Sequence, residues 1–297
     1  MHPYDERPYL RFTVIEWIVI FSLLFFMVIS SADAKPRKKK QKNYNVQTSE
    51  LSVMVTDITD DHITTSHNID KVRALASMTK LMTAMVALDY DSNMNRKLTL
   101  SKMAGSKMPK REYTRGELFH MLLIKSDNAA AETLAADYPG GREKFMKSMN
   151  LRAMMLDMYG THFDDPSGLS RMNVSTASDV TKMVIGASEY PQIRDISTKK
   201  TTTILTQVKR KNRVLVLHNT NTAILSQVHG VQVSKTGYTN PAGFCVALLV
   251  EKNVGDTLHH QVIVVMGARN PSQRVDTVKR VVYNKRKGNN YETFRRV

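Results

Sequence analysis

The sequence predicts an α+β fold in which an antiparallel sheet is built from both ends of the chain, with flanking helices and an inserted helical lobe. Short segments with the alternation or β-branched content of strands occur at 51–56 and 61–66, and similar segments return after residue 200. Between them, from about 98 to 190, the chain reads mostly as helices. A cleft between two such lobes is the place where we expect a functional site.

The spacing of apolar residues predicts the individual elements. Met78, Leu81, Met82, Met85 and Leu88 recur at steps of three and four, which indicates a helix that begins near residue 77 and buries one face. Further helices are expected at 115–124, 129–136, 141–156, 178–188 and 272–283. Later strands are expected at 202–208, 214–217, 231–234, 243–250 and 261–266.

The first 34 residues have the pattern of an export signal. An unbroken apolar run at 17–29 is too short to cross a bilayer comfortably, and it is followed by an Ala-x-Ala sequence that ends at Ala34. We therefore expect a signal peptide at 1–34 and a periplasmic protein; acidic residues near the run leave an uncleaved anchor as the alternative. A basic linker at 35–48, a folded domain at 49–284 and a polar tail at 285–297 complete the expected organisation.

Composition limits the class of partner. The 297 residues are 42% hydrophobic, which suits a folded core, and they carry a formal net charge of +16. Such a surface favours an anionic partner, and export makes nucleic acid the least suitable one. The basic cluster at 35–40 is expected to be a solvated arm without a catalytic role. Cys245 is the only cysteine, which excludes an intramolecular disulfide, and its apolar neighbours predict a buried side chain rather than a nucleophile.

Three short motifs occur in order: Ser77-Met-Thr-Lys80, Ser126-Asp-Asn128 and Lys235-Thr-Gly237. A serine and a lysine three residues apart share one face of a helix, so a nucleophile and a base can meet there. The lysine acts as a base only when it is neutral, and burial or a nearby cation, for which Lys235 is the candidate, lowers its pKa. A helix N-terminus at Ser77 also places N–H groups near a developing oxyanion.

Two of these motifs have further copies in the chain. A second Ser-x-x-Lys begins at Ser197, and Ser-x-Asn also begins at Ser66 and Ser148. The copy at 197 precedes a threonine-rich strand, the one at 66 comes before the candidate nucleophile, and the one at 148 lies inside a helix. Ser126 instead falls in a break between helices. Order and local setting therefore support the assignment more than any single motif does.

With these motifs the chain resembles the low-molecular-mass penicillin-binding proteins, serine D-alanyl-D-alanine peptidases, and among them most closely the D-alanyl-D-alanine endopeptidases of the penicillin-binding protein 7 type. The resemblance covers nearly the whole mature chain and implies a β-lactamase/transpeptidase-like fold. It rests on strings at 76–85, 125–131, 138–141, 165–169, 173–176 and 234–240, several of which have no catalytic duty.

The resemblance also implies roles for residues. Ser77 would be the acyl-ester nucleophile, Lys80 its proton acceptor and Ser126 the proton relay to the leaving amine. Backbone N–H groups of Ser77 and Tyr238 would form the oxyanion hole.

Substrate-binding roles would fall to Asn128, Lys235 and Thr236, the last two near the carboxylate of the ligand. Asp127 is a minor departure, since the subgroup often carries Glu at this position. The implied function is penicillin-sensitive hydrolysis of D-alanyl cross-links in peptidoglycan, without metal or organic cofactor. The implied partners are stem peptides, β-lactams as covalent inhibitors and other cell-wall enzymes, with at most loose membrane association.

Other functions remain open at this point. A D-alanyl-D-alanine carboxypeptidase would share the same three motifs. A class A-like β-lactamase would too, but no Glu-x-x-Leu-Asn string lies between Ser126 and Lys235. A non-catalytic envelope-binding protein would fit the basic charge, yet none of the motifs is damaged. His259 and His260 are interpreted as solvated surface rather than a metal site.

Overall fold

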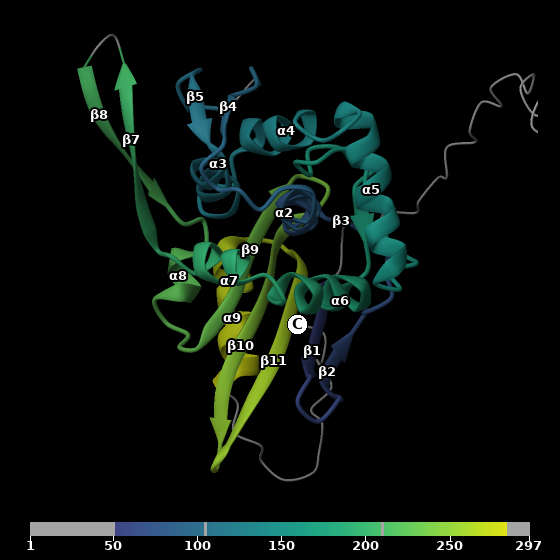
Figure 1. Ribbon diagram of the computed structural model, residues 1–297. Helices are drawn as coiled ribbons and strands as arrows, with labels where there is room; N and C mark the ends of the chain where they lie inside the picture. The colour runs from purple at the N-terminus through teal and green to yellow at the C-terminus, as the bar shows by residue number, and fades with distance from the viewer. Residues whose placement is uncertain (1–50, 104–105, 209–210, 284–297) are drawn as a thin grey trace, which may run out of the picture. The chain divides into compact units, whose positions relative to one another are not determined.

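A five-stranded antiparallel sheet with the order β2-β1-β11-β10-β9 forms the centre of the fold (Figure 1). The computed structural model describes residues 51–103, 106–208 and 211–283; the predicted signal peptide, linker and polar tail lie outside them. The strands are β1 (Ser52–Asp57), β2 (His62–His67), β9 (Val231–Thr239), β10 (Gly243–Val254) and β11 (Thr257–Ala268). Because β1 pairs with β11, the sheet joins early and late parts of the chain, as the sequence predicts.

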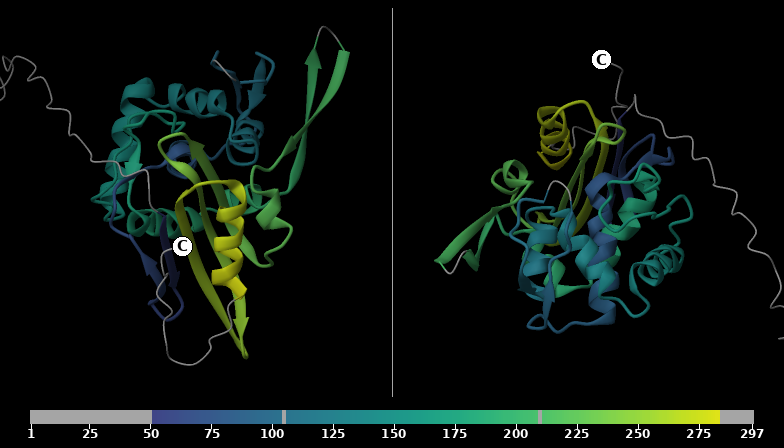
Figure 2. Two further views of the ribbon diagram at one scale, coloured as in Figure 1. Left: turned by 180° about the vertical axis from the view of Figure 1, so that it is seen from behind. Right: turned by 90° about the horizontal axis from the view of Figure 1, so that it is seen from above.

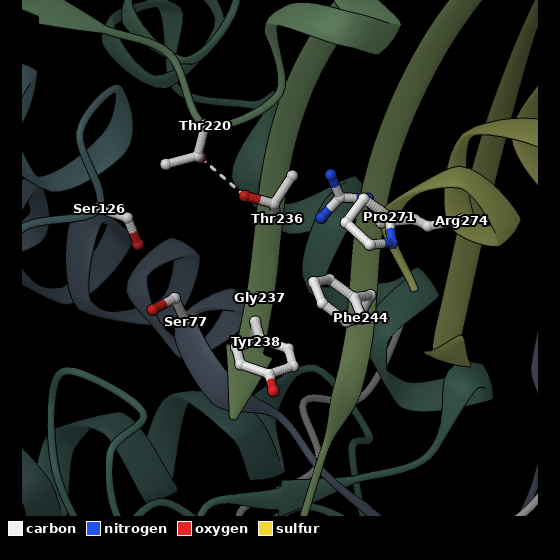
Figure 3. Close-up of a pocket in the computed structure, with 9 residues that line it drawn as sticks. All are labelled: Ser77, Ser126, Thr220, Thr236, Gly237, Tyr238, Phe244, Pro271 and Arg274. Atoms are coloured by element: carbon white, nitrogen blue, oxygen red, sulfur yellow. Dashed lines mark hydrogen bonds between the residues drawn. The ribbon is translucent and has the colours of Figure 1, made fainter. Parts of the chain in front are cut away.

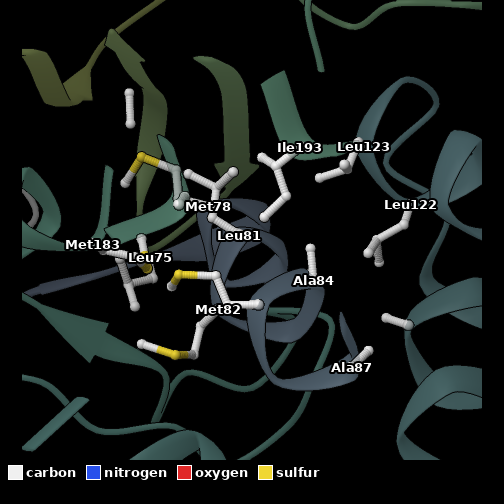
Figure 4. Close-up of a cluster of buried hydrophobic side chains, with 14 of the residues drawn as sticks. Leu75, Met78, Leu81, Met82, Ala84, Ala87, Leu122, Leu123, Met183 and Ile193 are labelled. Atoms are coloured by element: carbon white, nitrogen blue, oxygen red, sulfur yellow. The ribbon is translucent and has the colours of Figure 1, made fainter. Parts of the chain in front are cut away.

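Both faces of this sheet are buried. Alternate side chains of each strand point to opposite sides, and the side chains on each side pack into a hydrophobic core. Val53 and Val55 of β1 pack with α9 (Pro271–Tyr283) and α8 (Thr222–Leu225), and α9 lies across β10 and β11 (Figure 2). Met54 faces the other way, into the larger core that α2 (Thr79–Tyr90) and α6 (Ala177–Ser188) help to form (Figure 4). The first motif therefore begins a helix that is held by the main core.

The middle of the chain is mainly helical. Its further helices are α3 (Arg115–Leu123), α4 (Asn128–Ala136), α5 (Gly141–Met155) and α7 (Pro191–Ser197). Thr114 and Glu117 form a capping box at the start of α3, which explains why that helix begins where it does. Sequence spacing did not predict α7, α8, the short strand pair β4 (Lys97–Thr99) with β5 (Glu112–Thr114), or β3 (Arg73–Ala74) with β6 (Val174–Ser175).

β7 (Thr201–Val208) and β8 (Lys211–His218) form a separate two-stranded hairpin (Figure 1). Ile204 and Leu217 are each only 2% exposed and belong to the main core. The hairpin is thus anchored by one of its faces, and β8 ends directly before Asn219 and Thr220.

The sheet differs from the prediction at β9, which continues to Thr239 instead of ending at residue 234. Pairing with β10, for example Lys235 opposite Ala247 and Gly237 opposite Cys245, keeps the third motif inside the strand. Backbone pairing here outweighs the low strand propensity of a Lys-Thr-Gly sequence. Cys245 is fully buried, as predicted, and burial raises the pKa of its thiol to about 11. None of the helices within the described ranges is long and apolar enough to span a bilayer.

Candidate active site

Ser77 lies in the short 3-10 turn Ala76–Met78 that leads into α2. Ala76 has a φ of 47°, a left-handed conformation that is unusual for a residue with a side chain. Two glycines surround this turn: a Cβ on Gly168 would lie 1.9 Å from the carbonyl oxygen of Ala76, and one on Gly237 would lie 3.0 Å from that of Leu75. Glycine at these positions lets a loop and strand β9 approach the serine closely.

Lys80 is the centre of the hydrogen bonding around Ser77. Its Nζ donates to Ser77 Oγ at 3.0 Å, to Asn128 Oδ1 at 2.7 Å and to the Ser167 carbonyl oxygen at 2.6 Å. The side chain is completely buried, and this burial lowers the pKa of Lys80 to about 7, although Asp165 and other carboxylates favour its charged form. Near neutral pH the amine can therefore exist in the uncharged form that accepts a proton.

Ser126 and Lys235 form a second serine–lysine contact, 109 residues apart in sequence. Ser126 has a φ of 61° in the break between α3 and α4, and Lys235 Nζ donates to its Oγ at 3.0 Å and to the Thr236 carbonyl oxygen at 2.9 Å. Burial, then repulsion from Lys80 and Arg274, holds the pKa of Lys235 well below its usual range. Lys235 was the expected cause of a lowered pKa of Lys80, but burial is what lowers it, and Lys235 is not among its causes.

Asp127 has a structural role between Ser126 and Asn128. It is the N-cap of α4, where its Oδ1 accepts from the Ala130 N–H at 3.0 Å, and its Oδ2 accepts from Ser106 Oγ at 2.9 Å. Asp is among the best N-cap residues, so its presence in the second motif fixes the start of α4. Asn128, the first residue of that helix, is thereby held toward Lys80.

The turn after Phe163 supplies a contact that the sequence analysis missed. Asp165 Oδ1 accepts from the backbone N–H groups of Ser167 and Gly168, each at 2.6 Å. Burial opposes ionisation of Asp165, but these and other hydrogen bonds outweigh it and lower the pKa of the carboxyl. Asn173, fully buried, donates to the Asp165 carbonyl oxygen at 2.7 Å. The turn thus holds the Ser167 carbonyl against Lys80; its string was only a mark of resemblance in the sequence.

Both serines open onto a pocket of about 340 Å³ (Figure 3). Its lining residues are Ser77, Ser126, Thr220, Thr236, Gly237, Tyr238, Phe244, Pro271 and Arg274. The rings of Tyr238 and Phe244 stack at 4.2 Å and form one wall. The lining does not include Lys80, Lys235 and Asn128. The two lysines contact the serines from the protein interior. Four of the predicted site residues thus face the pocket, and three support them from within.

Four lining residues lie outside the predicted set, Thr220, Phe244, Pro271 and Arg274, and two of them, Thr220 and Arg274, have polar side chains. Thr236 Oγ1 donates to Thr220 Oγ1 at 2.7 Å. The Arg274 side chain is nearly buried, its guanidinium points toward Thr236 (Figure 3), and its Nε has no hydrogen-bond partner among the described residues. Both reach the site only through pairing and packing of late elements, so no spacing in the sequence could indicate them.

The family model for D-alanyl-D-alanine carboxypeptidases, peptidase S11, matches residues 37–270 of this chain. The chain belongs to the peptidase S11 family. This confirms the resemblance inferred from the motifs and the class of enzyme, a serine peptidase.

Two relatives of this S11 peptidase illustrate how far the similarity extends. A D-alanyl-D-alanine endopeptidase of Pseudomonas aeruginosa is 35% identical over 233 residues, which cover 76% of this chain and 74% of the relative. A D-alanyl-D-alanine endopeptidase of Escherichia coli is 38% identical over 205 residues, which cover 66% of each. The chain thus matches between two thirds and three quarters of their lengths.

The fold is shared with a solved structure. Penicillin-binding protein D2 of Listeria monocytogenes, in a cefotaxime-bound form, has 26% sequence identity and a TM-score of 0.68, covering 82% of this chain and 98% of that chain. The predicted α+β, transpeptidase-like fold is therefore confirmed.

Proposed function

We propose that this S11 peptidase is an exported, periplasmic endopeptidase that hydrolyses D-alanyl cross-links between peptidoglycan stem peptides through an acyl-enzyme on Ser77. One observation carries the proposal: Lys80, whose pKa is lowered to about 7, lies within hydrogen-bond distance of Ser77 Oγ. A buried amine in this state can take the proton of the serine as the hydroxyl attacks.

In the proposed acylation step, Ser77 Oγ attacks the D-alanyl carbonyl carbon while Lys80 accepts the hydroxyl proton. The N–H groups of Ser77 and Tyr238, two residues that face one pocket, would bind the oxyanion. The C–N bond then breaks, and the leaving amine receives a proton through Ser126, which Lys235 contacts. Water later attacks the ester, releasing the D-alanyl carboxylate and restoring the Ser77 hydroxyl.

The ligand carboxylate would lie beside Thr236, close to the buried basic side chains of Lys235 and Arg274. The guanidinium of Arg274 points to Thr236 and its buried Nε has no partner among the described residues, while the buried Lys235 donates to the Thr236 carbonyl oxygen. A charged donor that lacks a protein partner is suited to bind an anionic group of the ligand. Asn128 would act mainly through Lys80, whose Nζ donates to its side-chain oxygen.

The names of the relatives support the choice of the cross-link as the bond that is cleaved. Those of P. aeruginosa and E. coli are named endopeptidases, and this favours cleavage of cross-links over removal of a terminal D-alanine. The Listeria protein is solved in a cefotaxime-bound form, which supports binding of β-lactams by this chain as well. A carboxypeptidase is the second candidate, because the family as a whole carries that description.

The decisive experiment incubates the purified protein with cross-linked muropeptide dimers and, separately, with monomeric pentapeptides, and follows the products by mass. We expect the dimers to be cleaved. Cleavage of pentapeptides alone would establish a carboxypeptidase, and cleavage of neither would favour an envelope-binding protein. Labelling with a fluorescent penicillin should be lost in Ser77→Ala; persistent labelling would exclude Ser77 as the nucleophile.

A further inference from the structure

The base of the β7–β8 hairpin is tied to two parts of the site, strand β9 and the break between helices that carries Ser126. β8 runs directly into Thr220, which lines the pocket and accepts a hydrogen bond from Thr236 at 2.7 Å. The Thr220 N–H also donates at 3.1 Å to the carbonyl oxygen of Ile124, two residues before Ser126. Any ligand group that passes Ser126 and Thr236 on leaving the pocket therefore meets Thr220 and then the hairpin.

One face of this hairpin is apolar and uncovered. Leu205 and Val214 are cross-strand neighbours, 74% and 58% exposed, and Val216 beside them is 52% exposed. Ile204 and Leu217 point the opposite way, into the core. Three neighbouring exposed aliphatic side chains on a strand pair mark a surface that is suited to binding.

The outer edge of β8 is also unpaired. β7 and β8 form a sheet of two strands, and no other described strand pairs with either of them. On the β7 side, Arg111 donates to the Leu205 carbonyl oxygen at 2.8 Å and so occupies part of that edge. The β8 edge is the one left to accept an added extended chain.

Charge indicates what kind of chain would bind there. From residue 196 to 234 the sequence has six Lys and Arg and no Asp or Glu. Within this stretch Lys200 and Arg213 are exposed, and Lys125 is exposed next to Ser126. A peptide that carries carboxylates complements this side of the pocket, and every free C-terminal peptide end supplies at least one.

We propose that the β7–β8 hairpin binds the leaving half of the cross-linked substrate, an extended carboxylate-bearing peptide that lies along the β8 edge and contacts Val214 and Val216. This inference rests on the proposed endopeptidase function, in which the amine released past Ser126 and Thr236 belongs to a second stem peptide. The hairpin thereby favours cross-linked over monomeric substrates.

The test compares a double variant, Val214→Thr with Val216→Thr, with the wild type. Threonine keeps the β-branched shape and removes the apolar surface. We expect kcat/KM for muropeptide dimers to fall about tenfold, mainly through KM, while acylation by fluorescent penicillin changes less than about twofold. Arg213→Gln should act in the same direction. Val254→Thr is the matched control, since Val254 is 47% exposed on a strand and lies at the opposite end of β10 from pocket-lining Phe244.

Each other outcome identifies which idea fails. Unchanged dimer cleavage in the double variant would overturn the hairpin inference alone, and so would an equal loss on penicillin and dimer, because that pattern indicates a disturbed site. If the wild type cleaves no dimer, the proposed endopeptidase function fails, and the inference that rests on it fails too. Thermal unfolding of each variant shows whether the hairpin substitutions preserve the fold.

Discussion

Lys80 acts as the proton acceptor only if its amine is neutral and lies within hydrogen-bond distance of Ser77. Its surroundings meet both requirements. Burial removes the solvation that would keep the ammonium charged, whereas Asn128 and the Ser167 carbonyl fix the position of Nζ. The carboxylates that favour the charged form leave the pKa near 7 rather than lower. At the scale of single residues, the site is thus set for reaction close to neutral pH.

A pH profile tests this state directly. Because the neutral amine is the proton acceptor, the rate of acylation by fluorescent penicillin should rise with pH below about 7 and level off above it. The measurement is the rate of labelling by fluorescent penicillin at a series of pH values from pH 5.5 to 9, with Ser77→Ala as the blank. None of the pocket-lining residues is a histidine, so imidazole titration does not imitate the effect. A rate that is constant from pH 6 to 8 would contradict the role of Lys80.

Arg274 provides a second test at this scale. If its guanidinium binds the ligand carboxylate, Arg274→Gln should raise KM for a muropeptide dimer by about tenfold or more, as expected for a lost charged hydrogen bond. The matched control is a dimer in which the carboxylate next to the scissile bond on the leaving side is amidated; on this dimer the substitution should change KM little. An equal loss on both dimers would show that Arg274 serves the fold rather than the carboxylate.

At the scale of elements, the site depends on how closely two segments approach the turn at Ser77 and on the break between helices that carries Ser126. Gly168 has a φ of +84° in the loop next to Ala76, and Gly237 brings β9 against the same turn. Ser126, in turn, is exposed to the pocket because α3 and α4 are separated by a short break with Asp127 as N-cap. Ser77 and Ser126 therefore owe their positions to the ends of helices, whereas the third motif lies inside strand β9.

Gly168→Ala tests the approach at Ala76. The new Cβ would lie 1.9 Å from a backbone oxygen, so the loop or the serine turn has to move. We expect stability to fall by more than about 2 kcal/mol and penicillin acylation to be lost. Gly255→Ala is the matched control: its φ is +63° with nothing within 4 Å, so only the left-handed backbone cost of about 1–2 kcal/mol applies and acylation persists. Full acylation in Gly168→Ala would refute this account.

At the scale of the whole molecule, the long separations between contacting residues are bridged by the sheet and the helical core. Lys80 and Asn128 are 48 residues apart in sequence, and Ser126 and Lys235 are 109 apart. Arg115 links several helices on the way: it is fully buried, donates to Asp137 at 2.8 Å, and donates to the carbonyl oxygens of Ala87 and Asp91. It joins α3 to the ends of α2 and α4.

Replacing Arg115 should therefore affect the entire domain. Arg115→Met leaves Asp137 without one of its two arginine partners and removes the side-chain donor to the carbonyl oxygens of Ala87 and Asp91, and we expect a loss of about 3–5 kcal/mol in chemical denaturation. Arg142→Met is the matched control, because the Arg142–Glu132 pair at 2.9 Å is partly exposed and worth at most about 1 kcal/mol. Equal effects of the two substitutions would mean that Arg115 does not hold the helices together.

The sequence by itself determined the reaction class and the general fold. Serine and lysine at a three-residue spacing on an amphipathic helix, followed in order by the second and third motifs in their local settings, indicate a nucleophile and a base, and the segments of strand type at both ends indicate the sheet. These features are local, since each depends on residues that are neighbours in the chain. They could be predicted for that reason.

The tertiary structure decided the rest. The lowered pKa of Lys80, the contact with the Ser167 carbonyl, the extension of β9 through Gly237, and the presence of Thr220 and Arg274 at the pocket all depend on residues from distant parts of the chain. Burial and strand pairing exist only after the chain has folded, and no spacing along the sequence reports them.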